Sequence, residues 1–330
     1  HAEHGMGLIG DYRRLMRAGI ALARHDVILP GAYQTRLPLP ARIAGRILRI
    51  FGGGARGRPG ERLARALEKL GPAYIKLGQF LATRPDVFGA EVTQDLGRLK
   101  DKLPPFSMKA ARAALAEEFG EADAARLFAE LSDPVAAASI AQVHKMSLPE
   151  GERAVKILRP GIEHKLMVEL SAMKRAARTI EGISAESQRL KPVAFTETIA
   201  AAMMRETDLR LEAGGADEMH EISQKSGHFV IPSVDWDRTG RRVLTIDWID
   251  GISLTDPKAL DRPGIDRKKL ANDITQGFLT HAIEYGVFHA DMHEGNLIIT
   301  PEGKVALVDF GIIGRIGMVE RRFLAEILWG

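Results

Sequence analysis

Apolar positions recur at helical intervals over about residues 61–131, and short polar turn signals such as Gly71-Pro72 interrupt them. Within this part, Ser107 is a suitable N-cap for a helix over Met108 to Phe119. The pattern therefore predicts a helical extension over residues 61–131, built from several short helices.

Beyond Pro134 the pattern becomes strand-like. Residues 142–147 and 153–158 are short β-like runs joined by Pro149-Glu-Gly151, which predicts a hairpin. Further on, the spacing predicts helices over about 164–181, 193–214 and 266–285, and strands over 229–234, 242–248, 296–300 and 305–309. The last two strands are separated by the turn Pro301-Glu-Gly303. This mixture predicts an α+β fold.

The leading segment is basic and precedes a glycine-rich stretch. Arg42, Arg46 and Arg49 recur at helical spacing, with Ile43, Ile47, Leu48 and Phe51 available to another face. Such a helix could rest on an anionic lipid surface, or it could pack on the body of the protein as an ordinary amphipathic helix. Residues 52–60 are rich in glycine and predict a flexible linker.

Composition narrows the class of protein. The 330 residues are 45% hydrophobic and 27% charged, which is typical of a globular chain, and the absence of cysteine excludes disulfides, thiolate metal sites and a cysteine nucleophile. A net charge of +3 does not favour nucleic acid as a partner. The charge is uneven, because residues 1–70 carry 13 Lys and Arg against 5 Asp and Glu. No apolar run reaches the roughly 20 residues that a membrane-spanning helix needs.

The segment with the clearest chemistry is Phe288-His-Ala-Asp-Met-His-Glu-Gly-Asn296, followed by Val308-Asp-Phe-Gly311. Magnesium-assisted phosphoryl transfer needs an acid for the acceptor and hard oxygen ligands for the metal. Asp291 could orient the acceptor or take its proton, while Asn296 and Asp309 could bind Mg²⁺. The predicted hairpin between them would bring the two ligands to one cleft, and Gly311 would let the backbone turn sharply after Asp309.

Upstream, Lys156 lies on the predicted strand Arg153-Ala-Val-Lys-Ile157 among apolar residues. An unpaired ammonium group is costly in such surroundings, so Lys156 needs an anion. Glu212 on a later helix is the natural partner. The segment also resembles the strand that places a lysine on nucleotide phosphates in protein kinases, and this resemblance implies that Lys156 contacts phosphate while Glu212 holds its side chain.

These segments resemble the catalytic loop, Asp-Phe-Gly motif and lysine strand of protein kinases, with His289-Ala-Asp291 in place of His-Arg-Asp. The glycine-rich loop of ordinary kinases is missing, and the alanine-rich run from Val135 to His144 takes its place. Lys76-Leu-Gly-Gln79, with Lys76 and Gln79 on one helical face, precedes the kinase-like part. From about Leu70 to Gly317 the chain therefore resembles the UbiB family of atypical kinase-like proteins, also called AarF-domain proteins.

The resemblance implies further site residues. It places the segment with Lys76 and Gln79 over the nucleotide cleft as a gate, where a peptide substrate would otherwise bind, and it pairs Lys76 with the Glu206-Thr-Asp208 motif. It also implies that two further segments bind the nucleotide. One is a loop formed by Ala136, Ala137, Ala138 and Ser139, and the other is a hinge formed by Asp247, Trp248 and Ile249. The family usually carries asparagine at the position of Gly215, which puts any role taken over for Gly215 in doubt.

The predicted architecture is an atypical protein-kinase-like bilobal α+β fold with an N-terminal helical extension. Its expected parts are a basic segment and linker (1–60), the extension (61–131), an N-lobe with a helical insertion (132–250) and a C-lobe (251–330). Few residues follow Gly311, so we expect the C-lobe to be incomplete. The resemblance implies that the full protein can carry C-terminal membrane-spanning segments.

The resemblance implies a magnesium-dependent ATP- and ADP-binding protein that supports ubiquinone biosynthesis. We expect ATP hydrolysis first, transfer to a small or lipid-like acceptor second, and no protein phosphorylation. Expected partners are anionic membrane lipid, quinone-like intermediates and other ubiquinone-biosynthesis proteins, at the cytoplasmic face of a membrane, and no nucleic acid. Two alternatives stay open: a small-molecule phosphotransferase, which the Lys76-to-Gln79 segment disfavours, and a nucleotide-gated, non-catalytic chaperone for quinone intermediates.

Overall fold

The computed structural model describes residues 57–99, 103–182, 188–189, 191–261 and 265–329, together with Ala21. The predicted helix with Arg42 to Phe51 and most of the predicted linker lie outside these residues. The chain divides into two compact units, each described by itself below. The first comprises residues 1–104, 137–140 and 161–205, and the second comprises the remainder.

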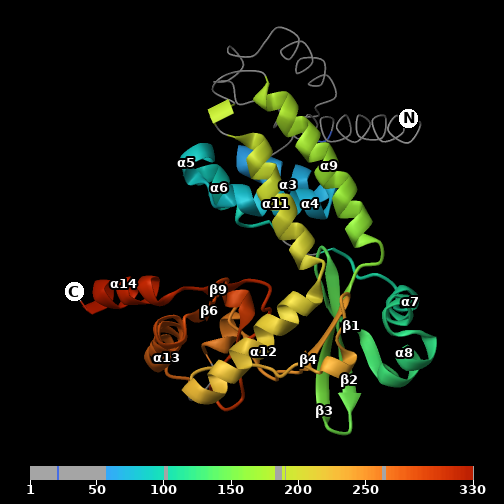
Figure 1. Ribbon diagram of the computed structural model, residues 1–330, viewed down its shortest axis with the longest axis vertical. Coiled ribbons are helices and arrows are strands. Elements are labelled where there is room, and N and C mark those ends of the chain that lie inside the picture. Colours follow the sequence, from blue (N-terminus) through green and yellow to red (C-terminus); the bar gives the residue numbers. More distant parts are fainter. Residues whose placement is uncertain are drawn as a thin grey trace. The chain divides into compact units, whose positions relative to one another are not determined.

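The first unit is helical (Figure 1). Its helices are α3 (Pro59–Leu70), α4 (Pro72–Ala82), α5 (Pro85–Phe88), α6 (Ala90–Leu96), α9 (Ile162–Glu181) and α11 (Pro192–Glu206). Four of them begin with proline, whose fixed φ and missing N–H suit the first helical position. Helix α3 packs against α4 and α6, and α9 packs against α4.

Two contacts fix α4, the helix that carries Lys76 and Gln79. A Cβ atom at Gly78 would lie 2.3 Å from Leu99 Cδ1 and 2.7 Å from Leu67 Cδ1, so only glycine allows this approach. At the start of the helix, the buried Glu169 of α9 accepts a hydrogen bond from the Ala73 N–H at 3.2 Å. That bond satisfies an N–H which the helix itself cannot pair, and it places a negative charge at the positive end of the helix.

The second unit contains a four-stranded sheet in the order β1-β2-β3-β4. Its strands are β1 (Leu131–Ala137), β2 (Ala141–Leu148), β3 (Gly151–Leu158) and β4 (Val243–Asp247). The predicted hairpin is confirmed, because β2 and β3 pair antiparallel and Leu148 lies opposite Gly151. Pro134 lies in β1, an edge strand, where its missing N–H does not interrupt the sheet.

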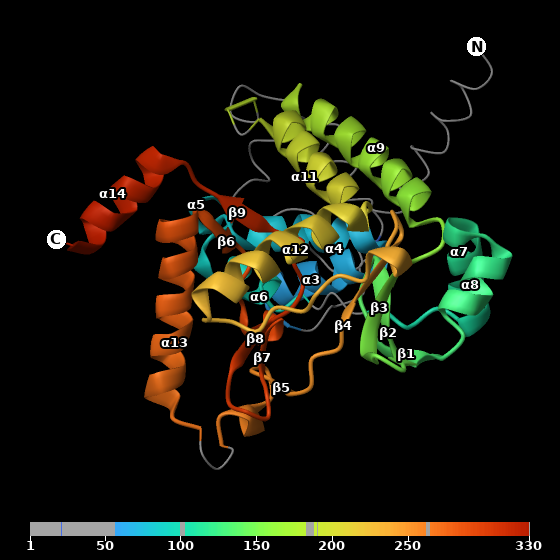
Figure 2. The same ribbon diagram turned by 60° about the horizontal axis from the view of Figure 1, so that its bottom comes forward.

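Helices α7 (Met108–Phe119) and α8 (Glu121–Leu127) cover this sheet on one side (Figure 2). Ser107 caps α7 as predicted, since its side chain accepts from the Ala110 N–H at 3.3 Å. Alanine and leucine side chains of the two helices meet Phe128 and inward-facing residues of β2 and β3 in one buried cluster. The small alanines let α7 lie close to the sheet.

The rest of the second unit contains the segments with Asp291, Asn296 and Asp309. It consists of α12 (Leu209–Ser226), α13 (Arg267–Thr280), a π-helical turn (His281–Tyr285), a sheet of β5 (Ile252–Ser253), β7 (Leu297–Ile299) and β8 (Val305–Leu307), the pair β6 (Val287–His289) and β9 (Ile313–Arg315), and α14 (Met318–Trp329). Short 3₁₀ turns lie at Trp236–Arg238, Pro257–Ala259 and Glu294–Asn296. A second buried core, with Met219, Phe229 and Phe310 among its members, joins α12 to these strands.

Three predicted elements are wrong in detail. The helix predicted over 193–214 is two helices, because Asp208 breaks it and caps α12 by accepting from the Arg210 N–H at 3.2 Å. The strand predicted over 229–234 is reduced to isolated bridges at Val230 and Val234. The helix predicted over 266–285 ends as a π-helical turn from His281.

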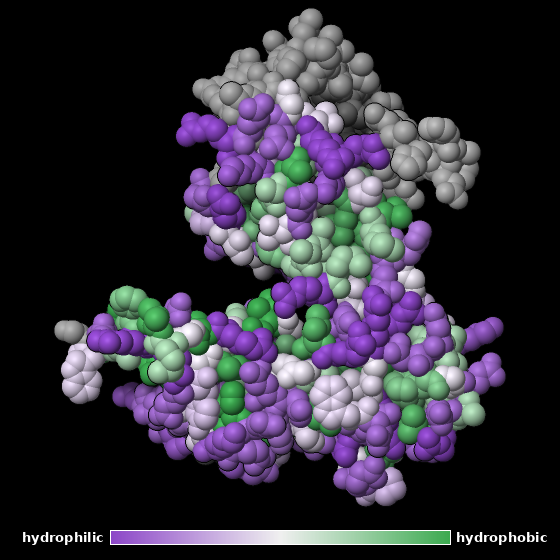
Figure 3. All heavy atoms as spheres, viewed as in Figure 1, coloured by the Kyte–Doolittle hydropathy of each residue, from purple (hydrophilic) through white to green (hydrophobic). Residues whose placement is uncertain are grey.

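Helix α14 exposes large apolar side chains (Figure 3). Phe323 is 60% exposed, Ile327 76% and Trp329 94%, and α14 has no buried residue. Within the described ranges, no helix combines the length and the apolar character that crossing a bilayer requires.

Candidate nucleotide and metal site

The predicted pair between Lys156 and Glu212 is present in the second unit. Strand β3 places Lys156 between its neighbours β2 and β4, and the first turn of α12 places Glu212. Both carboxylate oxygens of Glu212 lie 2.8 Å from Lys156 Nζ. Asp309 Oδ2 lies 3.7 Å from the same nitrogen, so one ammonium group joins two motifs that are far apart in sequence.

Charge and burial act against each other in this pair. Burial lowers the pKa of Lys156, but the nearby carboxylates of Asp309, Glu212 and Glu206 outweigh it and raise the pKa above its ordinary value. Burial also raises the pKa of Glu212, with Asp309 adding to the effect, while Lys156 opposes both. Lys156 is therefore held as a cation among these carboxylates.

Asp309 adopts an unusual backbone conformation with φ of 63°. Such an angle is strained for a residue other than glycine and persists only where neighbours enforce it. Here His289 contributes, since its Nε2 hydrogen-bonds the Asp309 carbonyl oxygen at 2.7 Å. The sharp turn that was expected from Gly311 therefore occurs two residues earlier. A Cβ at Gly311 would lie 3.3 Å from Asp309 Oδ1, so Gly311 leaves room for the carboxylate.

The loop after β6 is ordered by its own side chains. His289 Nδ1 accepts from the Asp291 N–H at 3.2 Å, and Asn296 Nδ2 donates to the Asp291 carbonyl oxygen at 3.0 Å. His293 Nδ1 accepts from the Gly295 N–H at 3.0 Å. These bonds fix the backbone of Asp291 while its carboxylate remains about half exposed. The acid is thus accessible to a reactant.

The hairpin of β7 and β8 places the backbone of Asn296 beside that of Val308, the residue before Asp309. Leu297 pairs with Leu307, and the Val308 N–H donates to the Asn296 carbonyl oxygen at 3.0 Å. Asn296 is buried and uses its amide N–H₂ internally, which leaves its Oδ1 as the available ligand atom. An amide oxygen and a carboxylate are the hard donors that Mg²⁺ prefers, so these residues fit the metal.

The donor set is small. No group of three or more His, Cys, Asp or Glu side chains in the described part of the chain could hold a metal ion. A magnesium ion here would have to complete its coordination with phosphate oxygens and water, which is how Mg²⁺ is usually held beside nucleotides. The chemistry of the donors therefore suits a metal that arrives with a nucleotide.

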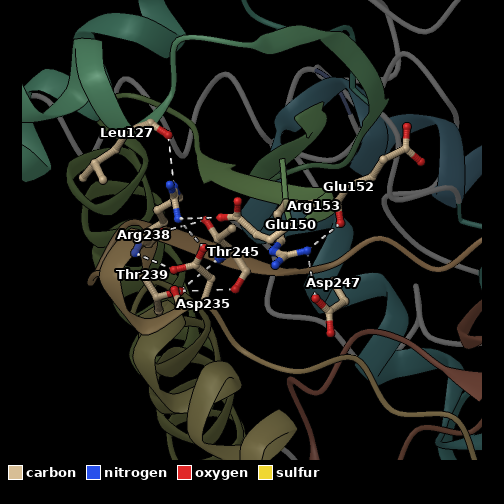
Figure 4. A network of polar contacts seen from close by, with 9 residues as sticks. All are labelled: Leu127, Glu150, Glu152, Arg153, Asp235, Arg238, Thr239, Thr245 and Asp247. Carbon is tan, nitrogen blue, oxygen red and sulfur yellow. Dashed lines mark hydrogen bonds and ion pairs between the residues drawn. The ribbon is translucent and has the colours of Figure 1, made fainter. Parts of the chain in front are cut away.

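The predicted hinge begins with Asp247, the last residue of β4, where Figure 4 shows a network of polar contacts. Arg153 of β3 binds Asp247 Oδ1 at 3.1 Å, and the Ser233 N–H donates to Asp247 Oδ2 at 3.0 Å. Nearby, Arg238 binds Asp235 at 2.7 Å and donates to the Leu127 carbonyl oxygen at 3.1 Å. The side chain of Asp247 is thus engaged in holding the sheet.

Backbone donors at the hinge are also engaged. The N–H of Asp247 donates to Ser233 O at 3.0 Å, and the N–H of Trp248 donates to Glu152 O at 3.0 Å. Trp248 also lies under Lys145, whose Nζ is 4.7 Å from its ring centroid. The adenine-binding role of Asp247, Trp248 and Ile249 stays a prediction.

The remaining predicted residues lie elsewhere. Ala136 and Ala137 belong to strand β1 rather than to a loop, and Ala138 and the buried Ser139 follow it. Lys76 and Gln79 are half-buried on α4 of the first unit. In the second unit Glu206 contributes to the electrostatics of Lys156, and Asp208 binds Arg210 at 2.6 Å, which lowers the pKa of Asp208. The nucleotide role of the alanine-rich segment and the gating role of the other four stay predictions.

A comparison with protein-family models matches residues 98–330 to the ABC1 atypical kinase-like domain. The chain belongs to this family. Curated relatives are named probable protein kinase UbiB in Marinobacter nauticus, 38% identical over 82% of this chain and 50% of the relative, and in Cellvibrio japonicus, 34% identical over 96% of this chain and 58% of the relative. The chain spans about half the length of the curated relatives it matches.

A solved structure supports the same fold. Rv3197 from Mycobacterium tuberculosis, in complex with erythromycin, is 26% identical, with a TM-score of 0.51 over 76% of this chain and 63% of the other. The predicted resemblance to UbiB proteins and the predicted α+β kinase-like fold are confirmed.

Two contacts of the site were not foreseen from sequence. His289 was recognised as part of the His-Ala-Asp motif, but not as the residue that holds the Asp309 backbone. Gly215 was marked as a departure from the family pattern, but its contact with Phe310 was not. Glycine within an amphipathic helix is a usable sequence signal, because it costs helix stability and therefore needs a packing reason.

Proposed function

We propose that this protein binds a magnesium–nucleotide complex and transfers its terminal phosphoryl group, with water as the first acceptor. The arrangement of Lys156, Glu212 and Asp309 carries the proposal, because it combines a desolvated cation for phosphate with a carboxylate for metal. Membership of an atypical kinase-like family supports the same chemistry.

In this proposal Lys156 contacts the α- and β-phosphates, and Glu212 keeps its ammonium group in place. Asn296 Oδ1 and Asp309 would hold Mg²⁺, which would neutralise phosphate charge. Asp291 orients the attacking water. The water oxygen forms a bond to the γ-phosphorus, the bond from that phosphorus to the bridging oxygen breaks, and ADP and phosphate result. The water proton passes to Asp291 and then to solvent.

The proposal also includes a pathway, a location in the cell and a set of partners. The names of the relatives support a role in ubiquinone biosynthesis, and the basic leading segment supports peripheral attachment to the anionic cytoplasmic face of a membrane. Candidate partners are anionic lipid, quinone-like intermediates and other proteins of that pathway. The helical extension (61–131) would contribute Lys76 and Gln79 to the gate, and the Glu206-Thr-Asp208 motif would contribute Glu206 and Asp208.

Transfer to a small hydroxylated acceptor is the second candidate. The half-exposed Asp291 carboxylate can accept a proton from an alcohol as readily as from water. The complex of Rv3197 with erythromycin supports the idea that a protein of this fold binds a small molecule. A non-catalytic nucleotide switch is the remaining alternative.

Phosphate release from ATP is the experiment that separates these functions. Turnover is measured alone, with anionic liposomes at low and high salt, and with a phenolic quinone mimic. We expect turnover without acceptor, stimulation by liposomes at low salt, and a loss of about 10²-fold or more in kcat for Asp291→Asn with little change in KM. Glu294→Gln, exposed on the same loop, is the control.

The other outcomes identify the alternatives. Turnover that requires a hydroxylated acceptor would identify a phosphotransferase. Nucleotide binding without turnover, even with liposomes and phenol, would identify a switch. If liposomes leave turnover unchanged and do not retain the protein at low salt, the membrane part of the proposal is wrong.

A further inference from the structure

Arg241 joins two helices of the second unit through its own backbone. Its N–H donates to Glu118 Oε1 of α7 at 2.5 Å, and its carbonyl oxygen accepts from the N–H of Leu209, the first residue of α12, at 2.8 Å. The first N–H groups of a helix have no partner within the helix. The bond to Arg241 therefore ties the start of α12 to a segment that is distant in sequence.

The turn that contains Arg241 is anchored to the four-stranded sheet. The Gly240 N–H donates to the Val243 carbonyl oxygen at 2.8 Å, at the start of β4. The N–H of Leu158, at the end of β3, donates to the Arg242 carbonyl oxygen at 3.0 Å. Through this turn, the start of α12 is held against the sheet.

The Glu118 carboxylate approaches the backbone of this turn closely. A Cβ atom at Gly240 would overlap Glu118 Oε1 and would lie 2.9 Å from Glu118 Cδ. Gly240 does not have a positive φ, so its backbone conformation does not require glycine. The approach of the carboxylate supplies the reason for glycine at this position.

The neighbouring Glu117 offers a contrast. It binds the side chain of Arg242 at 2.7 Å, and its own side chain is 65% exposed. Ion pairs this exposed contribute little to stability. Glu117 holds a side chain, whereas Glu118 holds the backbone of the residue that binds α12.

The start of α12 also positions Glu212. Glu212 follows Leu209 by three residues, so the two lie on one face of the first turn. Both carboxylate oxygens of Glu212 lie 2.8 Å from Nζ of Lys156, which β3 carries. A first turn that is loosened at Leu209 would therefore weaken the pair between the helix and the sheet.

We infer that Glu118 is a positioning residue: by holding the backbone of Arg241, it fixes the start of α12 and keeps Glu212 against Lys156. Its effect on turnover rests on the proposed function, whereas its effect on α12 does not.

The test compares Glu118→Ala and Glu118→Gln in the full chain, with Glu117→Ala as the matched control. Hydrogen exchange without nucleotide is measured for peptides covering residues 207–216, at the start of α12, and 267–280 in α13. For Glu118→Ala we expect about tenfold faster exchange at 207–216 and no change at 267–280. Glutamine keeps an acceptor oxygen for the Arg241 N–H, so Glu118→Gln should match the wild type, as should Glu117→Ala.

ATP turnover provides a readout that a general loss of stability would not reproduce. For Glu118→Ala we expect kcat to fall about tenfold while KM changes less than about threefold, because Glu212 orients Lys156 for the transition state more than it adds to nucleotide affinity. Glu118→Gln should restore the wild-type kcat.

A second variant covers the case in which Glu118→Ala fails to fold. The methyl group of Gly240→Ala would displace the Glu118 carboxylate, which is the mobile end of its side chain, and we expect the same changes. Wild-type exchange at 207–216 in the folded variants, or no recovery in Glu118→Gln, would overturn the inference. If the wild type hydrolyses no ATP, the proposed function fails, and the exchange measurement still decides the role of Glu118.

Discussion

Lys156 of the second unit lies near several negatively charged side chains. Three carboxylates, those of Glu212, Asp309 and Glu206, act on one ammonium group that is only 22% exposed. Pairs of this kind add little net stability, because desolvation offsets attraction, yet removal of one partner is costly. The pair is therefore weak evidence for the stability of the fold.

Lys156→Met tests this charge balance through pH. Burial already raises the pKa of Glu212, and loss of Lys156 removes the charge that lowers it. A folded-state pKa above the unfolded value stabilises at low pH, and that stability is lost as pH rises. We expect the variant to be about 3 kcal/mol less stable than wild type at pH 8, with a smaller deficit at pH 5, in urea unfolding.

Lys145→Met is the control for this experiment, because it removes an ion pair with Glu152 on the same sheet that is more exposed. Its effect should stay below about 1 kcal/mol at both pH values. A Lys156→Met deficit that does not grow with pH would contradict the charge balance described here.

Sequence predicted the Lys156–Glu212 pair because an ammonium group on a buried strand demands an anion. It did not predict the left-handed backbone of Asp309. That conformation is imposed by His289 and by the pairing of β6 with β9, which are tertiary contacts. Glycine adopts such an angle most easily, so the sharp backbone turn was predicted at Gly311, two residues after its actual position at Asp309.

The π-helical turn that ends α13 holds a buried histidine. His281 is 1% exposed, its Nε2 contacts Ser226 Oγ at 3.0 Å, and its ring meets Phe229 and Tyr285 edge-on. Burial, with a smaller contribution from His228, lowers its pKa from 6.5 to about 4. The element therefore tolerates the imidazole only in its neutral form.

This predicts acid sensitivity. Between pH 6.5 and about 4 the unfolded chain binds a proton at His281 that the folded chain does not, so stability should fall as pH is lowered through this range. His281→Gln should flatten the fall without removing it, since burial also lowers the pKa of His144. Urea unfolding at pH 5 and pH 7.5 measures the difference. Equal pH dependence in both proteins would rule out His281 as a cause.

Elements with local signals were predictable and those shaped by packing were not. Pro149-Glu-Gly151 marked the hairpin of β2 and β3, and Ser107 marked the start of α7. Asp208 also carries a capping signal, but the helical pattern continues across it in sequence and hid the break between α11 and α12. The π turn has no comparable signal, because it depends on how His281 packs against Phe229.

At the scale of the whole molecule, charge and apolar surface are distributed unevenly. Residues 1–70 carry the positive excess, and α14 exposes a row of large apolar side chains. The chain spans about half the length of the curated relatives it matches, so the activity of those proteins as a whole is not assigned to it. The second unit holds Lys156, Glu212 and Asp309, the residues on which the proposed function depends.

The central claim is that Asp309 binds the metal of a magnesium–nucleotide complex. The most direct test is calorimetric titration of ADP into the full chain, with Mg²⁺ and with EDTA, for wild type, Asp309→Asn and the exposed control Asp237→Asn. We predict that Mg²⁺ tightens binding to wild type and to Asp237→Asn, and that Asp309→Asn loses this enhancement while remaining folded. Equal enhancement by Mg²⁺ in Asp309→Asn would contradict the account.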